Sequence, residues 1–320
     1  MLPRSRLHPV VLAWVEKRRK GEVRCVAFSG GADSLALLFV LWAHGPEARE
    51  KLVALHFNHR LRGRASVADE NFCRRVCATL GLRLRVGQWR GARKGASEAE
   101  SRTARHDFFR REMKRLDSRA LWLAHQQDDI AETMLMRLAR GSGTAGLAAP
   151  RPVQAVNDGR LHLRPMLSLK KAEIVAALKK AGAEWREDAS NEGQDFFRNR
   201  IRRSVLPAWQ KAAQRDALAG AALARELLEE DDQALESWLD RLAPLQRGVL
   251  DLRALSGVSR ALVRRALHRW MLAVRPETDL SRQGFELLLA AVVRGTATRF
   301  SLGRSGFAVI RQGKLSFRKG

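Results

Sequence analysis

The chain has 320 residues, of which 45% are hydrophobic, so it can form two or three globular units and is not a disordered protein. Its 59 Lys and Arg exceed its 34 Asp and Glu, and the formal charge of +25 favours a polyanionic partner, nucleic acid above all. A solvated basic surface without a ligand is the alternative. The longest apolar run, residues 35–43, is far shorter than the roughly 20 residues that span a bilayer. Since the N-terminal segment lacks a signal-peptide pattern, we expect a cytoplasmic protein without a membrane span.

The first two thirds of the chain alternate between short apolar runs and segments of helical period. The apolar runs, which predict strands, cover residues 23–28, 52–57, 82–89 and 120–125. Apolar stripes with helical spacing occur at residues 66–80 and 97–116, and both stripes should lie on a sheet. This alternation predicts an α/β fold with a doubly wound parallel sheet.

A glycine-rich segment follows the first predicted strand and opens the next helix. It consists of Ser29, Gly30, Gly31, Ala32, Asp33 and Ser34. The glycines can adopt positive φ and turn backbone N–H groups inward, the serines add hydroxyl donors, and the helix start adds its dipole, so the segment predicts a phosphate cradle. It lacks the GK[ST] ending of a Walker A loop. An ordinary strand-to-helix connection capped by Asp and Ser is the structural alternative.

Polar side chains also gather after the second and fourth predicted strands, where ligands of parallel sheets bind. The second strand ends in the segment His56 to Gly63, which includes Arg60 and Arg62. The fourth strand ends in His125, and after it come three acids spaced to share one side of a first helical turn: Asp128, Asp129 and Glu132. The alternative role of the acids is only to cap the helix. The alternative role of the histidine is a structural hydrogen bond.

The composition changes in the middle of the chain. Gly and Pro become frequent between residues 141 and 165, and a helical segment at 170–182 and a polar loop follow. A dense cationic run comes next, formed by Arg198, Arg200, Arg202 and Arg203. This run is a candidate contact for a polyanion.

The last third of the chain predicts a second domain. Residues 211–242 are Ala- and Leu-rich with helical spacing, and positive charge nearly disappears between 216 and 240. Further helices are expected at 260–274 and 282–293, and a small β element at 298–302, 307–310 and 315–317. We therefore expect one domain over residues 1–209 and a smaller, mainly helical one over 210–320.

The glycine-rich segment resembles the SGGxDS loop of the N-type ATP pyrophosphatases, the PP-loop superfamily. Further segments carry a narrower resemblance, in this order along the chain: 56–63, 124–133, 188–191 and 197–202. Together they are similar to the tRNA(Ile)-lysidine synthase family, and Glu98, Arg102 and Arg105 fit its glutamate and paired-arginine motif. The chain departs from the family pattern at three positions to which we assign no chemistry: Gln126, Gln127 and Ile130.

The resemblance implies a ligase that modifies the wobble cytidine of tRNA(Ile) with a CAU anticodon. ATP adenylates the C2 oxygen of the base with loss of pyrophosphate, and L-lysine then displaces AMP to give lysidine. The expected substrates are therefore ATP, L-lysine and the tRNA, with Mg²⁺ on the polyphosphate. Residues 1–209 would form the catalytic domain, and residues 210–320 would help to bind the tRNA.

Under this hypothesis the candidate residues divide between the two steps. The segment Ser29 to Ser34 and His56 bind ATP, and Asp33 helps to place Mg²⁺. The charge on the α-phosphate is stabilised by Arg102 and Arg105, for which a tRNA-backbone contact or a surface pair is the alternative. The lysine ammonium is held and deprotonated by Asp128 and Asp129, with His125 as another candidate proton acceptor. A basic rim for the tRNA consists of Arg60, Arg62, Arg198, Arg200 and Arg202.

Other functions share part of this pattern. A tRNA cytidine thiolase has the same loop but normally carries CxxC pairs, which this chain lacks. An amide-forming synthetase shares the loop without needing such a positive charge. A non-enzymatic RNA-binding protein explains the charge but neither the loop nor the acids. The sequence does not predict the oligomeric state.

Overall fold

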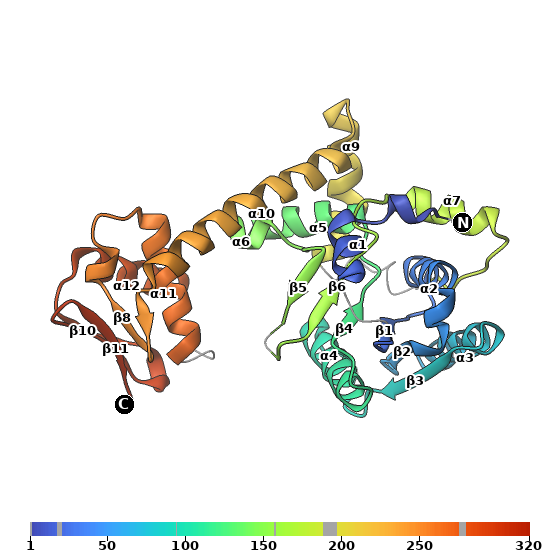
Figure 1. Cartoon of the computed structure of the whole chain (residues 1–320), viewed down its shortest axis with the longest axis horizontal. Helices are drawn as coiled ribbons and strands as arrows, with labels where there is room; N and C mark the ends of the chain where they lie inside the picture. Colours follow the sequence, from blue (N-terminus) through green and yellow to red (C-terminus); the bar gives the residue numbers. More distant parts are fainter. Residues whose placement is uncertain (1, 18–20, 94, 157, 188–196, 275–279) are drawn as a thin grey trace. The chain divides into compact units, whose positions relative to one another are not determined.

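The computed structural model describes residues 2–17, 21–93, 95–156, 158–187, 197–274 and 280–320. The chain divides into two compact units, Met1–Glu229 and Glu230–Gly320 (Figure 1). The division lies inside one long helix, α10 (Ala217–Leu242), and not at the boundary expected after residue 209. Within the described ranges, no helix combines the length and the apolar character that crossing a membrane requires.

The first unit is built on a six-stranded sheet with the order β3-β2-β1-β4-β6-β5. The strands are β1 (Arg24–Ala27), β2 (Leu52–Asn58), β3 (Arg83–Gln88), β4 (Ala120–Trp122), β5 (Val153–Ala155) and β6 (Leu161–Leu163). All neighbours pair in parallel except β5, which runs antiparallel to β6 at one edge. In the central register, Val26 of β1 lies between Ala54 of β2 and Trp122 of β4. The predicted α/β fold with a doubly wound parallel sheet is confirmed.

Helices alternate with the strands of this sheet, and some of them cover its two faces. The helices are α1 (Pro9–Glu16), α2 (Ala32–His44), α3 (Arg64–Thr79), α4 (Glu98–Arg115), α5 (Gln127–Leu138), α6 (Thr144–Leu147), α7 (Lys171–Lys180), α8 (Phe197–Arg200) and α9 (Leu206–Ala213), followed by α10. A π-helical turn, Ile201–Val205, joins α8 to α9. The helices predicted at 66–80, 97–116 and 170–182 correspond to α3, α4 and α7.

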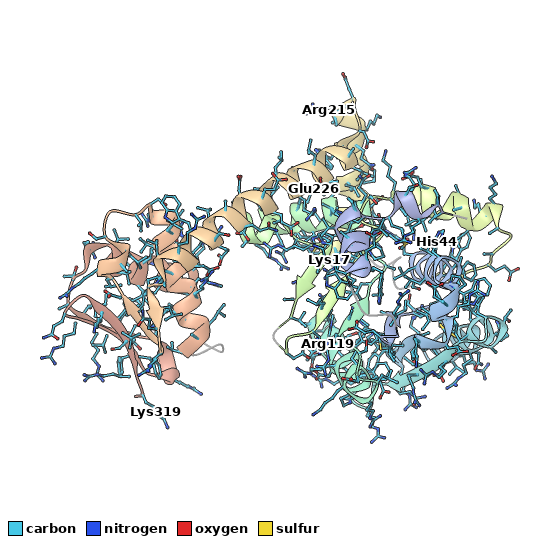
Figure 2. The ribbon with its side chains drawn as sticks, in the orientation of Figure 1. Lys17, His44, Arg119, Arg215, Glu226 and Lys319 are labelled. Atoms are coloured by element: carbon cyan, nitrogen blue, oxygen red, sulfur yellow. The ribbon has the colours of Figure 1, made fainter. Side chains whose placement is uncertain are left out.

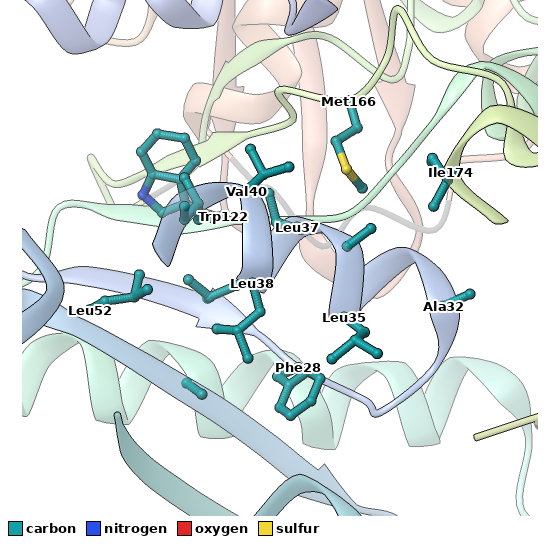
Figure 3. Packing of buried hydrophobic residues seen from close by; sticks show 14 of the residues in the cluster. Phe28, Ala32, Leu35, Leu37, Leu38, Val40, Leu52, Trp122, Met166 and Ile174 are labelled. Atoms are coloured by element: carbon teal, nitrogen blue, oxygen red, sulfur yellow. The ribbon is translucent and has the colours of Figure 1, made fainter. Parts of the chain in front are cut away.

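Alternate residues of the strands point to opposite faces, as the pleat requires, and in the central strands β1, β2 and β4 residues of both sets are buried. Val26 packs into the cluster formed with α2 and α3, whereas its neighbour Cys25 packs against α4 on the other face. Figure 3 shows the first cluster, in which Leu38 of α2 lies near Leu52 and Phe28. Because both faces are covered, the strand ends remain as the open edge at which a ligand can bind.

The second unit has its own core and its own sheet. The sheet is antiparallel, in the order β7-β8-β11-β10-β9, with strands β7 (Leu245–Gln246), β8 (Val249–Asp251), β9 (Thr298–Ser301), β10 (Phe307–Arg311) and β11 (Lys314–Arg318). Two helices, α11 (Arg260–Val274) and α12 (Arg282–Arg294), pack on it around the buried Trp270. The expected terminal β element is confirmed, although β7 and β8 were not predicted. Basic side chains such as Arg119, Arg215 and Lys319 project from both units (Figure 2).

Candidate active site

A pocket of about 590 Å³ opens at the carboxyl ends of β1, β2 and β4. Strand β1 lies between β2 and β4, so the pocket is at the point where the strand order of the sheet reverses, the usual ligand site of doubly wound folds. The candidate residues that line it are Ser29, Asp33, Ser34, His56, Arg62, Arg102, Arg105, His125, Arg198 and Arg202. The fold therefore brings together residues from five separate stretches of sequence.

The glycine-rich loop is held in shape by its own serines. The Ser34 hydroxyl accepts a hydrogen bond from the Ser29 N–H over 3.2 Å and donates one to the Gly31 carbonyl over 3.0 Å. Gly30 has φ +89°, and a Cβ there would lie 3.2 Å from the Sγ atom of Cys73. Glycine is thus required at this position by both conformation and space. Helix α2 begins at Ala32, so its N-terminal N–H groups and dipole adjoin the loop, as a phosphate cradle needs.

Asp33 is paired with a lysine that the sequence did not reveal. The Nζ atom of Lys171 lies 2.8 Å from the Asp33 carboxylate, 138 positions away in sequence. Burial raises the pKa of Asp33, and the Lys171 ammonium opposes that rise. The backbone N–H of Lys171 also donates to Asp128 over 3.0 Å. The start of α7 therefore connects the loop to the acids of α5, and the only sequence signal for it is a Lys pair after a Gly- and Pro-rich stretch.

The acids at the start of α5 take two different sets of partners. Arg198 donates to Asp129 over 2.6 Å and to Glu132 over 2.8 Å. Arg202 donates to Glu132 over 2.5 Å. Asp128 instead accepts the Lys171 N–H, and burial raises the pKa of its carboxyl group. Within the described residues, the acids therefore differ: Asp129 and Glu132 pair with arginines, and Asp128 does not.

The residues around Gln126 explain how the acidic turn is shaped. The Gln126 side chain accepts the Asp128 N–H over 2.6 Å, and Asp129 accepts the Gln126 N–H over 3.0 Å. This reciprocal capping box satisfies donors that the first helical turn would otherwise leave unpaired. Asp129 thus caps the helix and also pairs with Arg198, a residue that lines the pocket.

Several arginines line the pocket. Arg102 and Arg105 project from α4 into the pocket, and Arg164, which the sequence reasoning missed, follows β6. Burial and these arginines lower the pKa of His106 to about 4, and the same holds for His162, which faces Arg164 and Arg102. Two neutral histidines amid arginines indicate a strongly positive potential, which favours an anion.

Side chains of β2 and α3 make contacts that support the loop. His56 donates from Nδ1 to the Phe28 carbonyl over 3.0 Å, and burial lowers the pKa of its ring. Asp69 of α3 accepts from Arg62 over 2.6 Å and from Arg186 over 2.8 Å. The backbone N–H of Arg186 also donates to the Gly30 carbonyl over 2.9 Å. Arg186 therefore connects the glycine-rich loop to Asp69 of α3.

The remaining candidates lie away from the pocket or outside the described residues. Arg60 has φ +56° and an exposed side chain, and Arg200 is exposed with its guanidinium 5.7 Å from the Phe197 ring centroid. Both side chains are outside the pocket lining, as are those of the candidate acids Asp128 and Asp129. The segment Asp188 to Asn191 lies outside the residues that the structure describes, as does the side chain of Glu98.

The site fits a magnesium ion only in company with a ligand. Among the described residues, no group of three or more His, Cys, Asp or Glu side chains is arranged to hold a metal. Mg²⁺ is commonly held by one or two carboxylates together with phosphate oxygens and water. Asp33 beside the loop offers such a carboxylate, so the donor set suits an ion that arrives with a polyphosphate.

Comparisons with known proteins agree with this arrangement. The PP-loop domain family matches residues 7–209. A tRNA(Ile)-lysidine synthase of Solibacter usitatus is 39% identical over 259 residues, which cover 76% of this chain and 56% of that protein. The tRNA(Ile)-lysidine synthase of Chlorobaculum tepidum is 34% identical over 237 residues, or 72% of this chain and 70% of that protein. The chain spans about half the length of several curated relatives that it matches.

Among solved structures, the U34-tRNA thiolase NcsA from Methanococcus maripaludis with its 4Fe-4S cluster has a TM-score of 0.55 and 16% identity, covering 71% of this chain and 76% of that one. At this identity the likeness shows a common fold and nothing about the reaction. The sequence similarity to the lysidine synthases is much higher and extends over most of the chain. From these matches and the site that carries their motifs, the chain belongs to the tRNA(Ile)-lysidine synthase family of PP-loop proteins.

Proposed function

We propose that this protein ligates L-lysine to C2 of the wobble cytidine of a tRNA(Ile) with a CAU anticodon, using ATP and releasing AMP and pyrophosphate. The observation that carries the proposal is one pocket lined by residues of the Ser29–Ser34 loop and by arginines, two of which, Arg198 and Arg202, pair with the acids of α5. A two-step reaction of this kind needs all three: a cradle for polyphosphate, cations for a phosphoryl group and carboxylates for an amine. The family relatives support the same reaction.

The activation step uses the loop and the arginines that line the pocket. ATP would lie with its polyphosphate on the loop and on the N-terminus of α2, and Mg²⁺ would bind at Asp33 and the phosphate oxygens. The cytosine O2 attacks the α-phosphate, and pyrophosphate leaves. Charge is then concentrated on the α-phosphate oxygens, which Arg102 and Arg105 can stabilise from fixed positions on α4.

The ligation step needs a deprotonated amine. The ε-ammonium of lysine has a pKa of about 10.4 in water, so a group in the site must accept a proton before the nitrogen attacks C2 and AMP departs. Asp128 suits this task because burial raises its pKa and no arginine neutralises it among the described contacts. Asp129 and Glu132 are already bound to guanidinium groups, so their carboxylates are less available to the amine than that of Asp128.

Binding of the tRNA requires an unstacked base and a basic surface around the pocket. Arg60 and Arg200 are exposed and can contact phosphates. The other rim candidates, Arg62, Arg198 and Arg202, are bound to carboxylates of the chain, so part of their charge is already balanced. Replacement of Arg60 and Arg200 should therefore weaken tRNA binding more than ATP binding.

A thiolase is the alternative function that the fold permits. Such an enzyme normally presents paired cysteines, whereas Cys25, Cys73 and Cys77 are buried and separated from one another by more than two residues. Burial raises the pKa of the Cys73 thiol far above its usual range, which disfavours the nucleophilic thiolate. The cysteines thus favour packing roles over sulfur transfer.

The decisive assay mixes the purified protein with ATP, Mg²⁺, radiolabelled lysine and a tRNA(Ile) transcript. Label should appear in the tRNA, and a transcript with uridine at the wobble position should remain unlabelled. With ATP labelled at the α-phosphate and no lysine, the tRNA should instead carry labelled AMP. Absence of lysine transfer to the correct transcript would defeat the proposal.

A further inference from the structure

Arg164 is a buried cation that contacts His125. Its residue exposure is 6%, and within the described part of the chain no carboxylate lies at ion-pair distance from it. Its Nε–H donates to Nδ1 of His125 over 3.2 Å, and Nη1 donates to the Arg151 carbonyl over 2.7 Å. Two bonds in different directions fix the plane of the guanidinium, and through it the orientation of the His125 ring.

The chemistry of these two groups decides which histidine nitrogen carries the proton. A guanidinium has only donors, and the pKa of Arg164, lowered by burial and by Arg102 to about 10, still leaves it protonated at neutral pH. The Nδ1 atom of His125 must therefore offer a lone pair. A neutral imidazole has one proton, so that proton is on Nε2.

We propose that His125 acts in the proposed reaction as a neutral hydrogen-bond donor through Nε2–H, and that Arg164 is the positioning residue that fixes this state. The inference rests on the proposed function. It replaces the role of proton acceptor that the sequence alone allowed for His125. The group that accepts the hydrogen bond is an anionic oxygen of the phosphoryl group that is transferred to, and later leaves, the cytidine.

The surroundings of the ring support a donor. His125 lines the pocket, and among the described residues none accepts a hydrogen bond from Nε2. The charged groups around it are arginines from three elements, namely Arg164 after β6, Arg198 of α8, and Arg102 and Arg105 of α4. Burial and these cations hold the pKa of His125 well below its usual range. A ring in this field resists becoming an imidazolium, whereas it can donate to an anion without changing charge.

A consequence follows for the lysine step. If His125 cannot accept the proton of the amine, a carboxylate must, and Asp128 lies on the first turn of the adjoining helix. The pH dependence of ligation should therefore belong to a carboxyl group. Replacement of His125 should lower the rate without removing an ionisation from the pH profile.

The first test reads the tautomer directly and needs neither ATP nor tRNA, so it stands even if the proposed reaction fails. In the full chain labelled with ¹⁵N-histidine, His125 is assigned by comparison with His125→Gln, and its two nitrogens are followed by long-range ¹H–¹⁵N correlation from about pH 5.5 to 8.5. A protonated Nε2 and an unprotonated Nδ1 are expected throughout. A proton on Nδ1, or a ring that titrates in this range, would overturn the assignment.

The same spectra test Arg164. In Arg164→Met the ring should lose its single tautomer, whereas Arg164→Lys, which keeps a buried donor, should retain it in part. Native near-ultraviolet circular dichroism of each variant shows whether it has folded. An unchanged His125 signal in folded Arg164→Met would remove the positioning role.

The second test asks which nitrogen matters for the rate of AMP transfer to tRNA. Gln at position 125 can place an N–H donor near the former Nε2, whereas Asn can place one only near Nδ1. The rate should fall by about 10²-fold in His125→Ala and His125→Asn, the loss typical of one donor to a developing anion, and by less than about tenfold in His125→Gln. Equal losses in Gln and Ala, together with a missing ionisation, would instead identify a base.

Discussion

The side chain of Glu132 is almost completely shielded from water. It is 1% exposed and accepts hydrogen bonds from Arg198 and Arg202. The arginines are themselves 26% and 39% exposed, so the carboxylate carries most of the desolvation cost of the pair. The two guanidiniums therefore supply the ion pairs that this buried carboxylate needs.

Replacement of Glu132 by Gln should lower the free energy of unfolding by about 3 kcal/mol. The change leaves Arg198 and Arg202 without their shared carboxylate, and breaking a buried pair from one side costs about 3–5 kcal/mol, with the lower value expected because the arginines are partly solvated. Urea unfolding measures the loss. Glu184→Gln, at an exposed position, is the control and should change stability by less than about 0.5 kcal/mol. Equal effects of the two substitutions would contradict the energetic importance of the network.

The histidines beside the pocket arginines should make stability depend on pH. Burial and nearby arginines lower the pKa of His106 and His162 to about 4, whereas the unfolded value is 6.5. The unfolded chain therefore binds more protons between these values, so stability is full above pH 6.5 and falls as the pH drops toward 4. We expect a loss of about 1 kcal/mol per ring, since both are partly solvated. His162→Gln should reduce the slope of unfolding free energy against pH in this window, and an unchanged slope would contradict the low pKa.

The sequence predicted many of the candidate site residues but not the contacts between them. The loop, Asp129 and the arginine run were each recognisable, because each is a local pattern at a strand end or in a charge cluster. Their pairing was not, since Arg198 and Asp129 are 69 positions apart and Lys171 and Asp33 are 138 apart. Arg164 gave no signal at all, because one arginine among many carries no pattern until the fold buries it.

The number of residues in a helix or strand determined whether the sequence could predict that element. Helices α11 and α12 and the long strand β2 carry enough residues for a clear period, and they appear where the sequence placed them. Strands β5, β6, β7 and β8 have two or three residues each, too few for any period, and β5 and β6 lie in a Gly- and Pro-rich stretch that resembles a loop. Their pairing depends on neighbours distant in sequence.

Two glycines in different elements should respond to alanine with opposite signs. A Cβ at Gly87 of β3 would lie 2.4 Å from the Phe108 ring of α4, so Gly87→Ala should destabilise by about 1–3 kcal/mol through overpacking. Gly220 is in α10 with nothing within 4 Å of such an atom, and Gly220→Ala should stabilise by about 0.5–1 kcal/mol through helix propensity. Thermal unfolding of both variants tests the pair. Destabilisation by both would show that α10 does not tolerate the added methyl group.

At the scale of the whole molecule, each of the two units has its own hydrophobic core. Buried residues of the first unit form clusters on both sides of the large sheet, and those of the second unit form a separate one around α11 and α12. The net charge of +25 was readable from composition, and so was the presence of a second domain. The position of the division was not, because α10 is continuous across it and no Pro, Gly or change of period marks Glu229.

A destabilising substitution in the core of the second unit should weaken tRNA binding and leave ATP binding unchanged. Trp270 is fully buried, and its Nε1–H donates to the Gly248 carbonyl over 3.0 Å, so Trp270→Ala should destabilise the second unit by about 3–5 kcal/mol. Trp238, which is 50% exposed in the same unit, is the matched control. Filter binding should show weaker tRNA binding for Trp270→Ala than for Trp238→Ala, with equal ATP affinity for both. An equal loss of ATP binding in Trp270→Ala would contradict independent cores.

The packing of α10 determines how short a fragment of this chain can be and still fold and bind ATP. Leu218 and Ala221 of α10 are buried against Ile130 and Ala131, the apolar side of the helix whose first turn carries Asp128. A fragment of residues 1–209 contains all the PP-loop match but lacks this cover, so the acidic turn would rest on an exposed apolar surface. A fragment of residues 1–229 keeps it. Expressed side by side, the shorter fragment should aggregate while the longer one folds and binds ATP, which makes the first turns of α10 a working part of the nucleotide-binding unit.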